Sequence, residues 1–145
     1  METLYNIALT LLPGIGDKLG KTLIDYCGSA EAVFKEKKRN LEKIPDIGHV
    51  TAQKIVSQNV LARAEEELRF IEKHHIQTFF LKDKNYPRRL LHCSDSPLML
   101  YFKGEVDFNV EKVVSIVGTR RCTDYGRTAI TQLLADLKTA SALPQ

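Results

Sequence analysis

The chain has 145 residues, of which 43% are hydrophobic and 27% charged, and its net charge is +3. This length suits one ordinary domain or two small ones, and the composition is typical of a globular protein with a buried core. No apolar run approaches the ~20 residues needed to cross a bilayer. The N-terminus has no basic region ahead of its apolar residues, so we expect no secretory signal and place the chain in the cytoplasm, away from membranes.

The positive charge is confined to the second half of the sequence. Residues 1–75 hold 11 Lys/Arg and 11 Asp/Glu, whereas residues 76–145 hold 10 Lys/Arg and 7 Asp/Glu. If the chain binds a polyanion, this asymmetry directs the polyanion to the second half.

The cysteine pattern excludes two common kinds of small domain. Cys27, Cys93 and Cys122 are odd in number and far apart, and no C-x-x-C pair occurs. This spacing argues against a disulfide framework and against a zinc site. We therefore expect reduced cysteines and no bound metal.

An internal repeat organises the first half. Leu11–Ile24 (LLPGIGDKLGKTLI) aligns with Lys43–Val56 (KIPDIGHVTAQKIV) at an offset of 32 residues. The matched positions are Pro13 and Pro45, Ile15 and Ile47, Gly16 and Gly48, Gly20 and Ala52, and Leu23 and Ile55. The pattern predicts one structural unit that occurs twice.

Each copy of the repeat predicts a helix, a tight turn and a second helix. Leu4, Ile7 and Leu11 follow helical spacing ahead of the first turn. Pro13 disfavours continuation of that helix, and Gly14 suits a turn that needs positive φ. The first half is therefore expected to be helical.

Gly20, Ala52 and Ser29 add detail to the expected arrangement of the helices. Gly20 and Ala52 lack bulky side chains, which favours a close crossing of two helices at these positions. Ser29 precedes the helical sequence AEAVF and suits an N-cap. We expect an all-α domain over residues 1–63, with its two hairpins related by pseudo-twofold symmetry.

The repeated hairpins resemble the tandem helix-hairpin-helix, SAM-like domains of DNA-binding and DNA-repair proteins. In that family the hairpin amides bind a DNA phosphate, because unpaired N–H groups at a helix N-terminus attract an anion. The resemblance implies possible phosphate contacts at Gly14, Gly16, Lys18, Gly48 and His49. In the second copy Asp46 replaces the first glycine, and its carboxylate repels phosphate. The same domain type also serves as a spacer or a protein-binding module.

The second half opens with a helical segment and then changes its hydrophobic period. Residues 64–75 predict a connecting helix with one apolar face. Ile76–Leu81 and Leu98–Gly104 predict strands, separated by a turn. Val113–Gly118 is dense in β-branched residues, which predicts a third strand buried on both faces. Residues 126–137 then predict a helix with an apolar stripe.

The junction between the third predicted strand and this helix holds the candidate chemistry. Its strand–turn–helix order is that of the opening unit of a Rossmann-like fold, where anionic ligands meet a helix N-terminus. Arg120 and Thr123 stand where a dinucleotide fingerprint needs glycine, and no P-loop Gly-Lys pair follows. Arg120 and Arg121 favour an extended phosphate ligand; alternatively they are solvated or pair with Asp124.

Three ordered elements of the second half resemble the DNA-processing protein A (DprA/Smf) family. The matching residues are Tyr86, Pro87 and Leu90; Pro97, Leu100, Tyr101 and Gly104; and Val117, Gly118, Thr119, Arg120, Tyr125 and Gly126. The resemblance implies a fold of the α+β or α/β class. It implies a tandem helix-hairpin-helix domain over 1–63, a connecting helix over 64–75 and the first part of a Rossmann-like α/β domain, truncated, over 76–145.

The resemblance implies single-stranded DNA binding without catalysis, with no catalytic residues and no cofactor. The protein would protect incoming DNA and load the RecA recombinase during natural transformation and recombination. RecA contacts would lie in the missing C-terminal part, and the full-length protein would be a homodimer. The implied DNA contacts are Gly118, Thr119, Arg120, Arg121, Tyr125, Gly126 and Arg127. Tyr125 either stacks on a base or packs in the core.

Two other functions stay open. Nucleotide phosphoribohydrolase-like enzymes also place a Gly-Ser/Thr turn and a Tyr-Gly pair after a buried strand. Such an enzyme needs a carboxylate near its sugar site, and Asp124 is the nearby candidate. The second alternative function is that of an interaction module, whose hairpin domain binds another protein.

Overall fold

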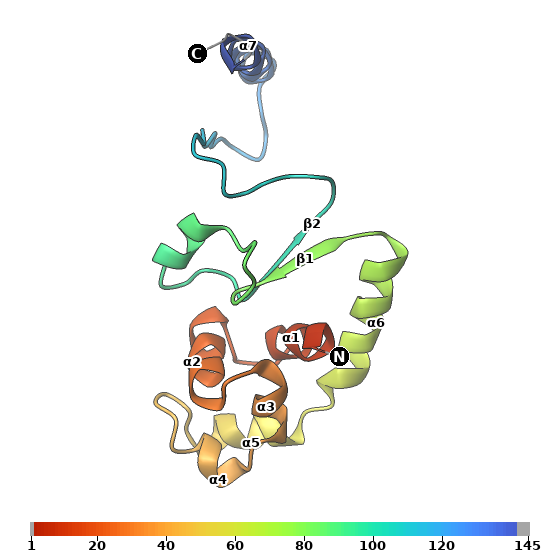
Figure 1. Ribbon diagram of the computed structural model, residues 1–145, viewed down its shortest axis with the longest axis vertical. Coiled ribbons are helices and arrows are strands. Elements are labelled where there is room, and N and C mark those ends of the chain that lie inside the picture. Colours follow the sequence, from red (N-terminus) through yellow and green to blue (C-terminus); the bar gives the residue numbers. More distant parts are fainter. Residues whose placement is uncertain (1, 142–145) are drawn as a thin grey trace. The chain divides into compact units, whose positions relative to one another are not determined.

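The computed structural model describes residues 2–141, so residue 1 and residues 142–145 of the predicted domains lie outside the described residues. The chain divides into two compact units, residues 1–110 and residues 111–145. Figure 1 traces the order of the elements along the chain. The domain boundaries inferred from sequence, 1–63, 64–75 and 76–145, stay a prediction.

Helices make up the first part of the first unit, as predicted. They are α1 (Glu2–Thr10), α2 (Asp17–Cys27), α3 (Ala30–Lys35), α4 (Lys38–Leu41), α5 (His49–Ser57) and α6 (Val60–Lys73). Their apolar faces meet in one core that includes Ile7, Leu23 and Ile55. Ser29 is the N-cap of α3, because its Oγ accepts a hydrogen bond from the Ala32 amide at 3.1 Å; this confirms the predicted cap.

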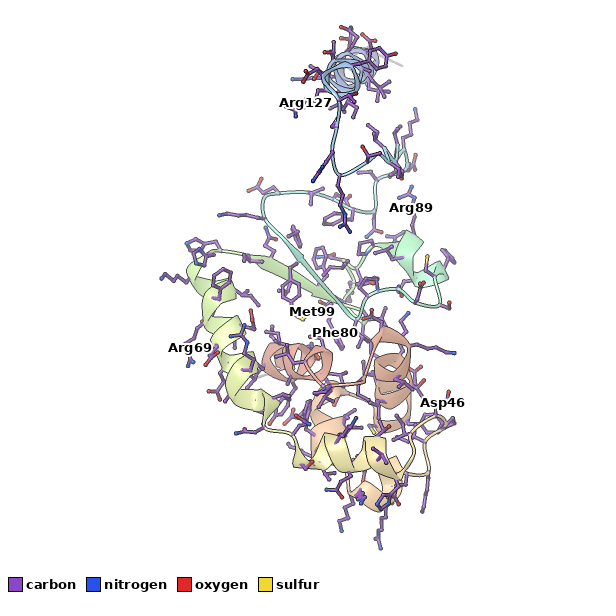
Figure 2. All side chains as sticks on the ribbon, turned by 180° about the vertical axis from the view of Figure 1, so that it is seen from behind. Asp46, Arg69, Phe80, Arg89, Met99 and Arg127 are labelled. Atoms are coloured by element: carbon purple, nitrogen blue, oxygen red, sulfur yellow. The ribbon has the colours of Figure 1, made fainter. Side chains whose placement is uncertain are left out.

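The two copies of the repeat adopt the same backbone turn. Gly14 has φ +82° and Asp46, at the equivalent position, has φ +64°. Asp is among the few side chains that tolerate the left-handed region, so the turn survives the replacement of glycine. Figure 2 shows Asp46 in the loop that precedes α5.

Hydrogen bonds repeat with the same offset. The Ile15 amide donates to the Leu12 carbonyl, and the Ile47 amide donates to the Ile44 carbonyl, both at 3.1 Å. Gly16 and Gly48 are the extended N-caps of α2 and α5. The sequence repeat is therefore a repeat of local structure.

A small antiparallel sheet follows the helices. Strands β1 (Gln77–Phe80) and β2 (Met99–Phe102) pair with each other, which confirms the strands predicted over 76–81 and 98–104. The segment between them includes the 3-10 helix η1 (Arg88–His92). Phe80 pairs with Met99, and both side chains belong to the core formed with the helices. Figure 2 shows these two residues between the sheet and α1.

Helix α2 packs directly against the segment that leads into β2. A Cβ atom at Gly20 would lie 2.2 Å from Leu98 Cδ1. The prediction that Gly20 marks a helix–helix crossing is therefore wrong, because its close neighbour is a side chain from the segment before β2. Leu98 is itself buried, and its amide donates to Asp17 Oδ1 at 2.8 Å.

The second unit contains α7 (Asp124–Ser141), which confirms the helix predicted over 126–137. Thr123 lies just before it, and its Oγ1 accepts a hydrogen bond from the Gly126 amide at 3.2 Å. This bond satisfies one of the first-turn amides, as an N-cap does.

The strand predicted over Val113–Gly118 does not form. Within residues 2–141 the structure has no strand there, and Val113, Val114 and Val117 are exposed rather than buried on two faces. A central strand is held by ladder hydrogen bonds to neighbours on both sides, and the described part of the chain offers none to this segment. β-branched composition alone therefore does not produce a strand here.

Candidate nucleic-acid interface

The contacts predicted in the second unit lie on one short stretch that leads into α7. Gly118, Thr119, Arg120 and Arg121 precede the helix, whereas Tyr125, Gly126 and Arg127 belong to its first turn. Gly126 is half-buried and the others are exposed. Figure 2 labels Arg127 at the start of this helix. The predicted residues are thus neighbours on an exposed turn.

Local hydrogen bonds shape this turn. Thr119 Oγ1 donates to the Arg121 carbonyl at 2.8 Å. A Cβ atom at Gly126 would lie 3.0 Å from Cys122 Sγ, so glycine allows the chain to fold back tightly at the helix start. These short-range contacts follow from the order of residues along the chain.

Arg120 and Arg121 are exposed cations. In the part of the chain that the structure describes, neither forms an ion pair with Asp124 or with another carboxylate. Tyr125 is 84% exposed, so the alternative of a packed core tyrosine is not what the structure has. Unpaired guanidinium groups and an exposed aromatic ring are groups that contact phosphates and bases.

The first hairpin combines a suitable backbone with an unfavourable charge. Gly14, Gly16 and Lys18 are exposed, and the first-turn amides of α2 have no partners within the helix. Asp17 lies between Gly16 and Lys18, and its carboxylate accepts a hydrogen bond from the Leu98 amide. The amides attract an anion, while this fixed carboxylate opposes one.

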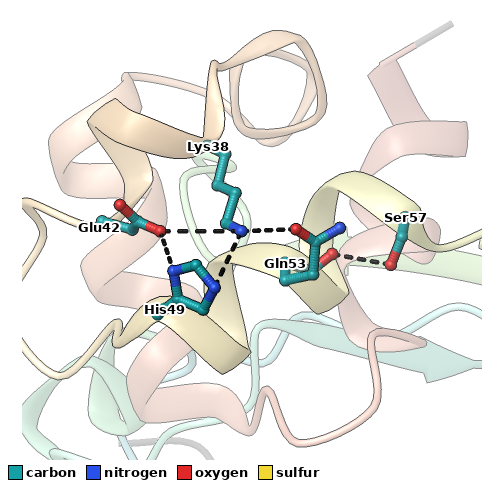
Figure 3. Close-up of polar contacts among 5 residues, drawn as sticks. All are labelled: Lys38, Glu42, His49, Gln53 and Ser57. Atoms are coloured by element: carbon teal, nitrogen blue, oxygen red, sulfur yellow. Dashed lines mark hydrogen bonds and ion pairs between the residues drawn. The ribbon is translucent and has the colours of Figure 1, made fainter.

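The second hairpin carries a polar cluster around His49 (Figure 3). Its Nδ1 is 2.8 Å from Glu42 Oε1, and its Nε2 is 3.2 Å from Lys38 Nζ. Lys38 Nζ also donates to Gln53 Oε1 at 2.6 Å. Because an ammonium group only donates, this geometry makes Nε2 the acceptor and Nδ1–H the donor to Glu42. Both ring nitrogens of His49 are therefore already engaged.

Sequence reasoning missed this cluster. Lys38 and His49 belong to α4 and α5, which the turn brings together. The spacing of Lys38 and Glu42 at i and i+4 was the available signal. Lys35, the last residue of α3, instead pairs with Glu31 at 2.6 Å, and this hydrogen bond raises the pKa of Lys35. His49, which follows Gly48, already uses both ring nitrogens in contacts with Glu42 and Lys38. The second hairpin is therefore a weaker candidate for a phosphate site.

Other ligand chemistry is sparse in the described residues. Cys27, Cys93 and Cys122 are free thiols, and burial raises the pKa of Cys27. Within residues 2–141 no group of three His, Cys, Asp or Glu side chains is placed to hold a metal ion. None of the described helices is long and apolar enough to span a bilayer.

Comparison with known proteins matches both parts of the chain to families. Residues 77–143 match the family described as DNA recombination-mediator protein A, and residues 7–58 match the SAM-like helix-hairpin-helix tandem. A curated relative, protein Smf of Synechocystis sp., is 30% identical over 132 residues, which cover 86% of this chain. The chain spans about a third (32%) of that relative's length. No solved structure matches the chain.

The fold and these matches define a class of protein. A helical tandem of hairpins precedes a mixed α/β part with a two-stranded sheet, and these two parts match the helix-hairpin-helix tandem and the DNA recombination-mediator family, respectively. The chain belongs to the DprA/Smf family. The family assignment made from the three sequence elements is confirmed.

Proposed function

We propose that this protein binds single-stranded DNA, with Arg120 as the main contact and Arg121 as a secondary one. One observation carries the proposal: both guanidinium groups are exposed on the turn that enters α7, without a carboxylate partner among the described residues. Membership in a family of recombination mediators supports DNA as the anionic ligand. Arginine contacts to phosphate carry no base information, so binding is expected to be independent of sequence.

The neighbouring residues take supporting roles in this proposal. The backbone amides of Gly118 and Thr119 would hydrogen-bond phosphate, Arg127 would add charge, and Tyr125 would stack on a base. Gly126 would allow the close approach, because its own amide already donates to Thr123 Oγ1. The hairpin residues Gly14, Gly16, Lys18, Gly48 and His49 are proposed as weaker phosphate contacts. Asp17 and the engaged ring of His49 are the physical reasons for ranking them below Arg120.

The biological role is also a proposal, because the chain spans about a third of its curated relative. We infer that the whole protein acts without catalysis in the cytoplasm, where it protects incoming DNA as a homodimer. It would then transfer this DNA to RecA. A direct check is whether the full-length protein speeds RecA nucleation on single-stranded DNA coated with a single-strand-binding protein.

Substitution of Arg120 tests the DNA contact. Arg120→Ala should weaken binding to oligo-dT and to mixed-sequence single strands alike. The slope of log affinity against log salt should flatten by about 0.7, the value for one phosphate contact on a single strand. The measurement is fluorescence anisotropy of labelled oligonucleotides at several salt concentrations.

Lys54→Ala is the matched control, because Lys54 is an exposed cation of α5 outside the predicted contacts. This variant should keep both the affinity and the salt slope. Circular dichroism would verify that each variant is folded. A folded Arg120→Ala protein with unchanged affinity and slope removes Arg120 from the binding site.

A further inference from the structure

The small sheet has a second face that the protein core does not use. Side chains alternate between the two faces of a strand, so the Phe80–Met99 pair faces the helices. The neighbouring side chains of β1 and β2, which include Phe79 and Phe102, lie on the opposite face. Both are half-buried. This face is formed entirely within the first unit.

Three phenylalanines gather on this opposite face. The ring centroids of Phe79 and Phe102 are 4.7 Å apart, and Phe108 meets them edge-on at 6.0 and 5.3 Å. The three rings line a cavity of about 480 Å³. This volume falls within the range of pockets that hold small organic ligands. An open aromatic cluster of this kind offers flat apolar surfaces to a planar ligand.

Hydrogen bonds hold the walls of the cavity together. Asn109 Oδ1 accepts from the Arg88 amide at 2.8 Å, and Asn109 Nδ2 donates to the Tyr86 carbonyl at 3.3 Å. Gln77 Nε2 donates to the Gly104 carbonyl at 2.7 Å on another side. The loop that carries Phe108 is therefore tied to the turn before η1, and the aromatic cluster is preorganised.

Two cations line the same cavity. Lys84 and Arg88 are exposed, and in the described residues neither side chain forms an ion pair or a hydrogen bond. Asp107 is the acidic residue of the lining, and its Oδ1 accepts the Asn109 amide at 2.8 Å. Aromatic rings beside unpaired cations are the combination with which proteins hold unpaired nucleotides, by stacking on the base and pairing with the phosphate.

We propose that this cavity, the aromatic groove lined by Phe79, Phe102, Phe108, Lys84 and Arg88, binds one nucleotide of single-stranded DNA. The base stacks on the phenylalanine rings, and the adjacent phosphate meets Lys84 and Arg88. The inference rests on the proposed function and adds a second contact region to it, on the first unit rather than at the α7 turn. A paired duplex does not fit this mode, because its bases are already stacked on one another.

Separate variants test the two parts of the groove by their salt dependence. Phe108→Leu keeps an apolar side chain but removes a stacking surface, so it should weaken oligo-dT binding roughly tenfold and leave the salt slope unchanged. Lys84→Ala should weaken binding and flatten the slope by about 0.7. Lys82→Ala is the matched control in the same turn, because Lys82 Nζ donates to the Gly28 carbonyl at 3.3 Å and does not line the groove.

Cross-linking locates the contact without any substitution. Oligo-dT that carries 4-thiothymidine is irradiated with the complete chain, and tryptic peptides are identified by mass spectrometry. Phe79, Phe102 and Phe108 fall on three different peptides, 74–82, 90–103 and 104–112. Adducts on these peptides are expected, together with adducts on the peptides 113–120 and 122–127 from the α7 turn, which lie within residues 113–127.

The outcomes separate this inference from the proposed function. Loss of binding in the groove variants, with adducts on the three groove peptides, supports the groove even if Arg120→Ala has no effect. Adducts confined to 113–127, with full affinity in Phe108→Leu and Lys84→Ala, overturn the groove and leave the proposed function intact. Absence of any oligo-dT binding by the unmodified protein overturns both. If Phe108→Leu does not fold, the exposed Lys84 variant and the cross-links decide.

Discussion

At Gly20, the side chain that the fold can accept depends on Leu98, a residue far away in the sequence. Alanine is the better helix former by about 1 kcal/mol, but a Cβ here would lie 2.2 Å from the buried Leu98. We expect Gly20→Ala to lower the free energy of unfolding by about 1–3 kcal/mol, as overpacking does. Urea unfolding monitored by circular dichroism measures this change.

Gly16→Ala is the control for the Gly20 substitution. A Cβ at Gly16 meets nothing within 4 Å, and its φ of −90° suits any residue. Because Gly16 is the N-cap of α2, where alanine is less favourable than glycine, this variant should cost at most about 1 kcal/mol, through the cap alone. Combining Gly20→Ala with Leu98→Ala should cost less than the sum of the two single effects, because the clash is gone. Strict additivity of the two changes contradicts the proposed clash.

Tyr86 links the stability of the protein to alkaline pH. It is 1% exposed, and its hydroxyl donates to the Pro97 carbonyl at 2.6 Å. Burial is the main cause that raises the pKa of Tyr86 above its usual value of 10.0. Only the protonated hydroxyl donates, so its contribution is fully present below pH 10 and is lost as the pH rises through the folded-state pKa.

Tyr86→Phe isolates this dependence. At pH 7 it should lower the free energy of unfolding by about 1 kcal/mol, the net value of one hydrogen bond. The difference in melting temperature between wild type and variant should shrink above pH 10. A difference that stays constant from pH 7 to pH 11 shows that the hydroxyl is not the titrating group.

At the scale of elements, α2 is joined to the segment before β2 by a lysine. Lys21 Nζ donates to the Ser94 carbonyl at 2.9 Å and to Ser96 Oγ at 2.7 Å. We expect Lys21→Met to lower stability by about 1 kcal/mol. Amide exchange over residues 93–98 should become faster. Lys18→Met on the same helix is the control, because Lys18 is exposed and its ammonium forms no hydrogen bond or ion pair with a described residue. Equal effects of the two variants contradict this role.

Across the whole molecule, many of the exposed apolar side chains lie in the second unit. In the second unit, α7 exposes Ile130, Leu133, Leu134 and Leu137, while Val117 in the preceding segment is 93% exposed. Contiguous apolar surface of this kind favours association, and an extended segment without strand partners can pair with another chain. We expect the 145-residue chain to self-associate as its concentration rises.

Sedimentation velocity over a range of concentrations tests this expectation. Leu134→Glu should shift the equilibrium toward monomer, because it places a charge in the apolar stripe of α7. Val50→Glu, at an exposed position of α5 in the first unit, should leave it unchanged. A wild-type chain that stays monomeric at the highest concentrations contradicts the expectation.

Much of the hairpin region could be predicted because its determinants are short in range. The turn at Gly14 needs positive φ, and the cap at Ser29 needs a hydroxyl three residues from an amide. Both requirements involve residues adjacent in the sequence. The same holds for Thr119 and Gly126 at the entrance to α7, whose contacts lie within three residues. The contacts of this turn with DNA remain a prediction.

Sequence alone was enough to locate most of the helices, the hairpin turns and the two paired strands to within a few residues, since propensity, capping and turn chemistry act over short distances. The tertiary structure determines which side chains from distant segments pack against each other. Leu98 fills the space beside Gly20, and Phe108 joins Phe79 and Phe102, through contacts between segments far apart in the chain. It also decided against a strand at Val113–Gly118. A strand is stable only when neighbouring strands complete its hydrogen bonds, and that condition is not written in its own residues.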